Sequence, residues 1–207
     1  MKHLDTVIFD LGGVLIDWNP RYLYRKIFSS EDEITWFLEN VCTNEWNEQQ
    51  DAGRSFEEAT HELLVRFPQH KAAIRAWNDR FEETVSGPIN ETVDILKAIR
   101  DQRLHRLFAL TNWSAETFPW ARRTFDFLHW FDGIVVSGEE KLVKPNTGIY
   151  KVLLDRYDVS PAGAVFIDDN LKNVEGARAT GIDGIHFRGA RKLREELQAR
   201  GILRVQD

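Results

Sequence analysis

The sequence predicts an α/β protein in which a doubly wound parallel sheet carries an inserted α-helical domain. From about residue 90 onward, short apolar runs alternate with segments of helical periodicity, a pattern typical of parallel strands covered by helices on both faces. Between Pro20 and about Phe81, by contrast, we find only helical spacing and no strand pattern. We therefore expect a core at residues 1–16 and 87–207 and a helical cap at residues 17–86.

The first expected strand is the apolar run at residues 7–9, which ends at Asp10 and is soon followed by Gly12 and Gly13. A buried strand that ends this way puts a charged oxygen at the carboxyl edge of a sheet, beside backbone that a ligand can approach closely. We therefore count both glycines among the expected substrate-binding residues. The ordinary alternative is a strand that leads into a turn, where Asp and Gly are common in any case.

Helix signals follow within the cap. Ser30 precedes three acidic residues and predicts a helix start. Ser55 and Glu58 have the spacing of a capping box, which predicts a helix that Pro68 stops. A further helix is expected over about residues 71–81.

After Gly87-Pro88 the expected elements alternate along the chain. The strands are expected at residues 107–110, 133–137, 164–167 and 184–187, and the helices from Asn90, at 148–157, at 173–180 and at 191–200. Right-handed crossovers then place these strands in one parallel sheet.

Polar residues gather where the expected strands end. They are Asp10, Thr111-Asn112 and Asp168-Asp169, joined by Lys144 in the loop after residues 133–137. In a parallel sheet these ends share one edge, so the side chains can face one cavity. Three converging carboxylates repel one another unless a cation lies among them, and oxygen ligands of this kind suit Mg²⁺.

The same cluster contains the groups that phosphoryl chemistry needs. Lys144 and Thr111 supply a positive charge and a hydroxyl donor for phosphate oxygens. An Asp carboxylate beside Mg²⁺ and a lysine is a known nucleophile for phosphoryl groups. The residues therefore indicate phosphoryl transfer at this edge of the sheet.

Four motifs in order carry a family resemblance. They are Asp10-Leu11-Gly12-Gly13-Val14, Leu110-Thr111-Asn112, Lys144-Pro145 and Phe166-Ile167-Asp168-Asp169-Asn170. This order resembles the signature motifs of the haloacid dehalogenase-like hydrolase superfamily, and the helical insertion resembles that superfamily's small α-helical cap. The resemblance implies a Rossmann-like core and, for a phosphatase-like member, an Mg²⁺-dependent hydrolase of phosphoric monoesters.

The resemblance also implies individual roles. Asp10 would be the nucleophile and a metal ligand, with the Gly12 carbonyl and Asp169 as the other ligands of Mg²⁺. Thr111 and Asn112 would hold the transferred group, and Lys144 would neutralise the nucleophile and the phosphate. Asp168 would support either the bound waters or Lys144, and Asn173 would point back into the site.

One position departs from the pattern. Phosphatases and mutases of this superfamily usually carry a second Asp two positions after the nucleophile, as general acid for the leaving group, and this chain has Gly12 there. General acid catalysis is typically worth ~10²–10⁴-fold. The gap argues against a phosphomutase, which must move a proton both ways. Asp17, Glu48 and a metal-bound water remain open as substitutes.

Two other functions are consistent with parts of the sequence. A metal-independent 2-haloacid dehalogenase needs no acid at Gly12, because halide leaves without a proton. Asp168-Asp169 would, however, set unneutralised charge beside an anionic haloacid, and for this reason we favour the phosphatase. The third possibility is a catalytically weak phosphate-binding or regulatory protein that lacks the acid.

The cap is expected to select the substrate, a small phosphorylated metabolite such as a sugar phosphate. Trp46 lies in a polar stretch and could stack on a sugar face, while Arg54 could pair with a second anionic group. The alternative, that Trp46 anchors the cap helices, is at least as well supported. Trp18 and Trp113 adjoin the first two motifs and could wall the cavity. Cap opening would hinge at residues 17–18 and 87–88.

The composition limits the partners and the cellular compartment that we expect. The net charge of −6 argues against nucleic-acid binding by phosphate neutralisation. The single cysteine, Cys42, excludes an intrachain disulfide and fits a reducing compartment. No signal peptide is evident and no apolar run approaches about 18 residues, so we expect a cytoplasmic protein without membrane partners. No protein partner is implied, and both a monomer and a dimer remain open.

Overall fold

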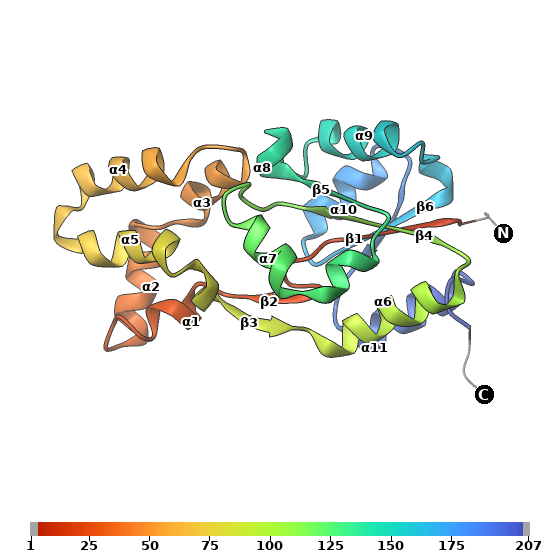
Figure 1. Ribbon diagram of the computed structural model, residues 1–207, viewed down its shortest axis with the longest axis horizontal. Coiled ribbons are helices and arrows are strands. Elements are labelled where there is room, and N and C mark those ends of the chain that lie inside the picture. The colour runs from red at the N-terminus through yellow and green to blue at the C-terminus, as the bar shows by residue number, and fades with distance from the viewer. Residues whose placement is uncertain (1–3, 205–207) are drawn as a thin grey trace.

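The computed structural model describes residues 4–204 and contains a parallel five-stranded sheet with a helical unit at one end (Figure 1). The strand order is β5-β4-β1-β6-β7, with all neighbours parallel. The strands are β1 (Thr6–Phe9), β4 (Arg106–Thr111), β5 (Gly133–Val136), β6 (Ala164–Asp168) and β7 (Asp183–His186). This architecture confirms the predicted α/β class. Residues 1–3 and 205–207 of the predicted core lie outside the described residues.

Helices cover both faces of the sheet because alternate side chains of its strands point to opposite sides. Val7 and Phe9 of β1 join an apolar cluster with α6 (Asn90–Gln102), α7 (Phe118–Thr124), η3 (Asp126–Trp130) and α11 (Ala190–Ala199). Ile8 faces the other layer, with α9 (Thr147–Arg156) and α10 (Leu171–Arg178). The short α8 (Ser137–Glu140) and η4 (Pro161–Gly163) complete this part of the chain. Since β4 and β6 flank β1, the end of β1 lies at the topological switch point of the sheet.

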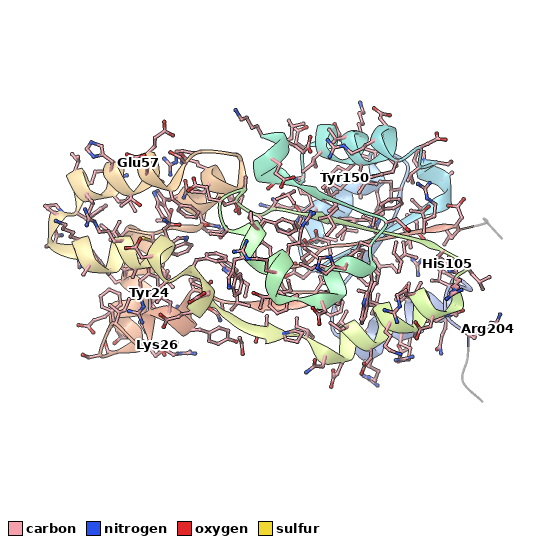
Figure 2. All side chains as sticks on the ribbon, in the orientation of Figure 1. Tyr24, Lys26, Glu57, His105, Tyr150 and Arg204 are labelled. Carbon is pink, nitrogen blue, oxygen red and sulfur yellow. The ribbon has the colours of Figure 1, made fainter. Side chains whose placement is uncertain are left out.

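The helical unit has an apolar cluster of its own, formed by residues 23–77. Tyr24, labelled in Figure 2, lies in this cluster together with Trp46 and Trp77. We call residues 21–79 the cap; its helices are α1 (Arg21–Tyr24), α2 (Glu31–Asn40), α3 (Asn44–Asp51), α4 (Phe56–Arg66), η1 (Pro68–His70) and α5 (Lys71–Asp79), followed by η2 (Phe81–Thr84). Within residues 4–204, no helix combines the length and the apolar character needed to cross a membrane.

Helix starts in the cap follow the sequence signals with one change. Ser30 caps α2 in a full capping box with Glu33. Ser55 caps α4 by accepting a hydrogen bond from the Glu58 N–H at 3.2 Å. The reciprocal capping box thus occurs at Ser30, where the sequence predicted only a cap.

The sequence analysis did not predict the two short strands that flank the helical block, whereas residues 20–81 contain helices and no strand, as predicted. β2 (Ile16–Trp18) and β3 (Val85–Pro88) form a two-stranded antiparallel sheet that joins the core to the cap. Both strands are short and contain residues with low strand propensity, such as Asp17 and Gly87. Asp17 and Gly87 pair with each other, so the two predicted hinge points lie side by side.

Candidate active site

Asp10 follows the last residue of β1 at the centre of the sheet edge. Its Oδ1 accepts a hydrogen bond from the Leu11 N–H at 2.7 Å, which orients the carboxylate. The chain then turns sharply at Gly13, whose φ of +70° favours glycine. A Cβ atom at Gly13 would lie 2.4 Å from Oδ2 of Asp169. The absence of a side chain there lets the two loops meet.

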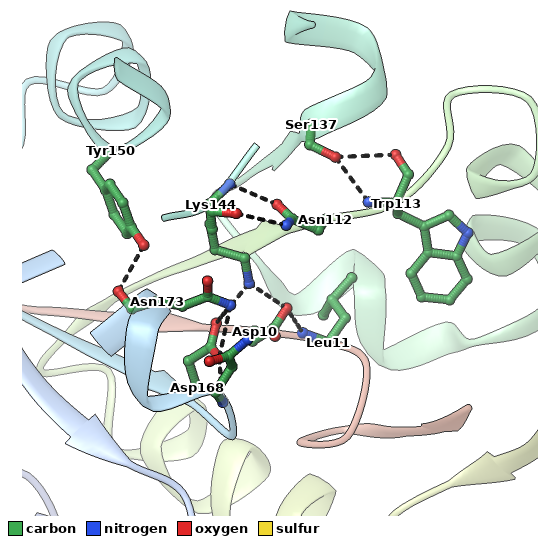
Figure 3. Close-up of polar contacts among 10 residues, drawn as sticks. Asp10, Leu11, Asn112, Trp113, Ser137, Lys144, Tyr150, Asp168 and Asn173 are labelled. Atoms are coloured by element: carbon green, nitrogen blue, oxygen red, sulfur yellow. Dashed lines mark hydrogen bonds and ion pairs between the residues drawn. The ribbon is translucent and has the colours of Figure 1, made fainter. Parts of the chain in front are cut away.

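Lys144 lies between two carboxylates in the buried part of the site (Figure 3). Its Nζ is 2.8 Å from Oδ1 of Asp10 and 2.7 Å from Oδ2 of Asp168. The Asn112 side-chain amide fixes the lysine backbone: its Oδ1 accepts from the Lys144 N–H at 2.9 Å, and its Nδ2 donates to the Lys144 carbonyl at 3.0 Å. Asn112 therefore positions Lys144, in addition to lining the cavity described below.

Asp168 is fully buried and held on several sides. The Asn170 N–H donates to its Oδ1 at 2.7 Å, and Nδ2 of Asn173 lies 3.1 Å from each of its oxygens. Asn173 in turn accepts a hydrogen bond from the Tyr150 hydroxyl at its carbonyl, at 2.7 Å. Of the two supports expected of Asp168, the contact with Lys144 is present. Asn173 points into the site, as the sequence resemblance implied.

The site has an excess of negative charge. One oxygen each from Asp10, Asp168 and Asp169 lies within 4.8 Å of the others, while Lys144 is the cation bonded among them. Burial raises the pKa of the Asp10 carboxyl; Lys144 opposes this shift, and the charges of Asp168 and Asp169 add to it. Burial lowers the pKa of Lys144, but the two carboxylates outweigh it and the net shift is upward. Three ionised carboxylates and one ammonium carry two net negative charges, so this all-oxygen donor set fits a divalent cation such as Mg²⁺.

A small cavity opens beside Gly12, between the core and the cap. Its aromatic lining residues are Trp18, Phe56, Phe81 and Trp113, and its polar ones are Asn47, Asp51, Asn112, Ser114 and Thr117. Trp18 and Trp113 therefore wall the cavity, as we expected. Thr111 ends β4 just before Asn112 and is buried.

The two cap residues predicted to bind substrate lie elsewhere. Trp46 is buried against Trp77, and its Nε1 donates to the Ala59 carbonyl at 3.3 Å. Arg54 donates to Gln50 at 2.7 Å and to Glu62 at 2.6 Å. Neither residue lines the cavity. Trp46 has the position of a cap anchor, which was the alternative interpretation.

The C-terminal end of α3 docks on the core and brings Asp51 into the cavity. The Ser137 hydroxyl donates to the Asp51 carbonyl at 2.6 Å, and Glu116 accepts a hydrogen bond from the Phe56 N–H at 2.8 Å. Desolvation raises the pKa of the Asp51 carboxyl to about 7; Glu48 adds to the shift, whereas Lys144 and the backbone hydrogen bond from Ser114 oppose it.

Residues 4–181 match the family model for haloacid dehalogenase-like hydrolases. The chain belongs to this family. It is 30% identical over 185 residues to the sesquiterpene phosphatase AstK of Aspergillus oryzae, covering 88% of this chain and 89% of that protein. It is 24% identical to a phosphorylated carbohydrates phosphatase of Thermotoga maritima, covering 88% and 84%. Among solved structures, a family enzyme of Bacteroides thetaiotaomicron in complex with magnesium and inorganic phosphate has a TM-score of 0.66 at 21% identity, covering 89% and 94%.

Membership of this hydrolase family confirms the resemblance that the four sequence motifs indicated. The structure also shows how the sequence-based candidates for the missing acid are placed in this hydrolase. Asp17 accepts a hydrogen bond from the Tyr22 hydroxyl at 2.9 Å, and Glu48 is exposed. Neither lines the cavity, whereas Asp51, which the sequence analysis missed, does. Asn47 and Asp51 are four residues apart, so the helical spacing of α3 was the available signal.

Proposed function

We propose that this hydrolase is an Mg²⁺-dependent phosphatase that transfers the phosphoryl group of a small phosphorylated metabolite to Asp10 and then to water. The observation that carries the proposal is the charge of the site, where three carboxylates converge around one lysine. A dianionic phosphate can enter such a site only if a cation accompanies it. The two phosphatase relatives, which are similar along most of their length, support the same chemistry.

Each residue has a distinct task in this proposal. Asp10 attacks phosphorus and forms a phosphoaspartate, while Lys144 pairs with the phosphate oxygens. The Thr111 hydroxyl and the nearby backbone of Gly12 and Gly13 bind the remaining oxygens. Asp10, the Gly12 carbonyl and Asp169 would hold Mg²⁺, which when bound supplies positive charge to the transferred group.

The residues that line the cavity indicate what kind of organic group the substrate carries. Its walls include four aromatic side chains, which favour a group with an apolar surface over a fully hydroxylated one. Asn47, Ser114 and Thr117 add hydrogen-bonding groups to the same walls. We propose that the substrate combines an apolar face with a few polar atoms. A sugar phosphate is the second candidate class, because aromatic rings also stack on sugar faces.

The proposal is tested by metal removal with two reactions measured in parallel. We expect phosphate release from p-nitrophenyl phosphate to stop in EDTA and to return when Mg²⁺ is restored. No halide should be released from 2-chloropropionate. Halide release that is insensitive to EDTA, without phosphate release, would establish the dehalogenase instead. Binding of Mg²⁺ and tungstate without any turnover would point to the regulatory protein. A panel of phosphorylated compounds then separates apolar from sugar substrates.

A further inference from the structure

Gly12 leaves open space where a general acid would act. A Cβ atom built at Gly12 meets no atom within 4 Å, and the residue lines the cavity beside Asp10. Gly13, one position later, is the opposite case, because a side chain there would collide with Asp169. The space at Gly12 is therefore free for a substrate atom, and this position itself supplies no proton.

Asp51 reaches this cavity from the cap. Its Oδ2 accepts a hydrogen bond from Nδ2 of Asn47 at 3.2 Å, and Ser114 of the core gives it a backbone hydrogen bond. The bond from the Ser137 hydroxyl to its carbonyl fixes its backbone as well. A carboxyl group held from both the cap and the core therefore lines the same cavity as Gly12.

We propose that Asp51 is the catalytic acid and base that takes the place of the side chain missing at Gly12. The assignment depends on the phosphatase function proposed above. As Asp10 attacks phosphorus, the bond to the leaving oxygen breaks and that oxygen takes the proton of the Asp51 carboxyl group, which gives a neutral alcohol. The Asp51 carboxylate then takes a proton from water as the water oxygen attacks phosphorus. The bond from phosphorus to Asp10 breaks, and phosphate leaves with both residues restored.

The surroundings of Asp51 suit this role. Its pKa of about 7 keeps a sizeable fraction protonated near neutral pH and lets the same group accept a proton afterwards. Glu48 on its own helix and Lys144 in the core are the charged groups that act on it. Lys141 after α8 packs against Gly53, and Arg54 is paired with Glu62. Desolvation has the largest effect, because the carboxyl group lies where α3 packs against the core.

The test compares two substrates of similar shape that differ in their need for a proton. p-Nitrophenolate leaves readily as an anion, whereas phenolate is a much poorer leaving group. We expect Asp51→Asn to lower kcat/KM roughly 100-fold for phenyl phosphate and less than about threefold for p-nitrophenyl phosphate. In the wild type, turnover of phenyl phosphate should fall as pH rises through about 7, because Asp51 loses its proton. This decline should be absent in the variant. Glu45→Gln, an exposed change in the first turn of the same helix, is the matched control.

A second variant separates lost chemistry from lost structure. Gly12→Asp, combined with Asp51→Asn, places a carboxyl group in the open space and should restore turnover of phenyl phosphate. Equal losses for both substrates, or no loss for either, would overturn the assignment of Asp51. Wild-type hydrolysis of p-nitrophenyl phosphate without hydrolysis of phenyl phosphate would overturn it too. If the wild type hydrolysed neither compound, the phosphatase function itself would fail.

Discussion

The core side and the cap side of the active site are built in different ways. On the core side, Lys144 is 3% exposed and Asp168 is fully buried, and their charged groups are bonded to one another. The Asn173 amide also donates to the Asp168 carboxylate, and the Asn112 amide oxygen accepts from the Lys144 backbone N–H. On the cap side, Trp18 and Asp51 are half-buried and Phe56 presents an apolar ring. The rigid, charged wall suits the reaction common to many substrates, and the aromatic wall suits selection among them.

Removal of the nucleophile should have the largest effect. Asp10→Asn keeps the shape of the side chain but cannot attack phosphorus, so turnover of p-nitrophenyl phosphate should fall more than about 10⁴-fold. Near-ultraviolet circular dichroism checks that the fold is retained. Residual activity above one per cent of wild type, after purification free of contaminating phosphatases, would place the nucleophile elsewhere on the core side.

Loss of the buried cation should affect both stability and activity. Lys144→Met leaves Asp10 and Asp168 without their shared partner, and breaking a buried pair costs about 3–5 kcal/mol. Urea unfolding at neutral pH measures this change. Lys151→Met, an exposed substitution in α9, is the control and should leave the free energy of unfolding nearly unchanged. Equal stability of the two variants would mean that the core wall is less constrained than its contacts indicate.

Two adjacent glycines allow a matched test of the metal site. Gly13→Ala forces Asp169 to move, because the new Cβ would lie 2.4 Å from its carboxylate, and its φ of +70° is also unfavourable for alanine. The apparent Mg²⁺ affinity, titrated through activity, should fall about 10–100-fold. Gly12→Ala adds a methyl group to open space and should change that affinity little. The same affinity in both variants would argue against Asp169 as a ligand.

The smallest effect is expected on the aromatic wall. Trp18→Leu removes an aromatic surface from the cavity and should raise KM for p-nitrophenyl phosphate about 2- to 10-fold, with kcat largely retained. Trp36, which is 46% exposed and outside the cavity lining, provides the control through Trp36→Leu. A loss confined to kcat would contradict the division between the two walls.

The sequence predicts the core wall well for a topological reason. Asp10, Asn112 and Asp168 each follow or end a buried strand, and parallel strands bring such ends to one edge whatever the loops do. Lys144 was located by the same rule, although its exact partners needed coordinates. The motif order of the family added roles to these positions.

The cap wall was less predictable. α3 is almost entirely polar, so its sequence shows little helical periodicity, and the inward orientation of Trp46 depends on packing against α4 and α5. In the sequence, nothing distinguishes Asp51 from Glu45 and Glu48, the other acidic residues of the same helix. It acquires its position only because Ser137 and Ser114 bind the end of the helix. Contacts between segments far apart in the chain carry this information, as they do for the pairing of β2 with β3.

That pairing determines how the cap can move. β2 and β3 run side by side, with Ile16 paired to Pro88 and Asp17 to Gly87, so the chain leaves and re-enters the core through a single ribbon. Both crossings between core and cap therefore lie at one place, and a swing of the cap would pivot about this ribbon. Each swing would carry Asp51 and the aromatic rings together, so release of product and withdrawal of the proton carrier would occur in one motion.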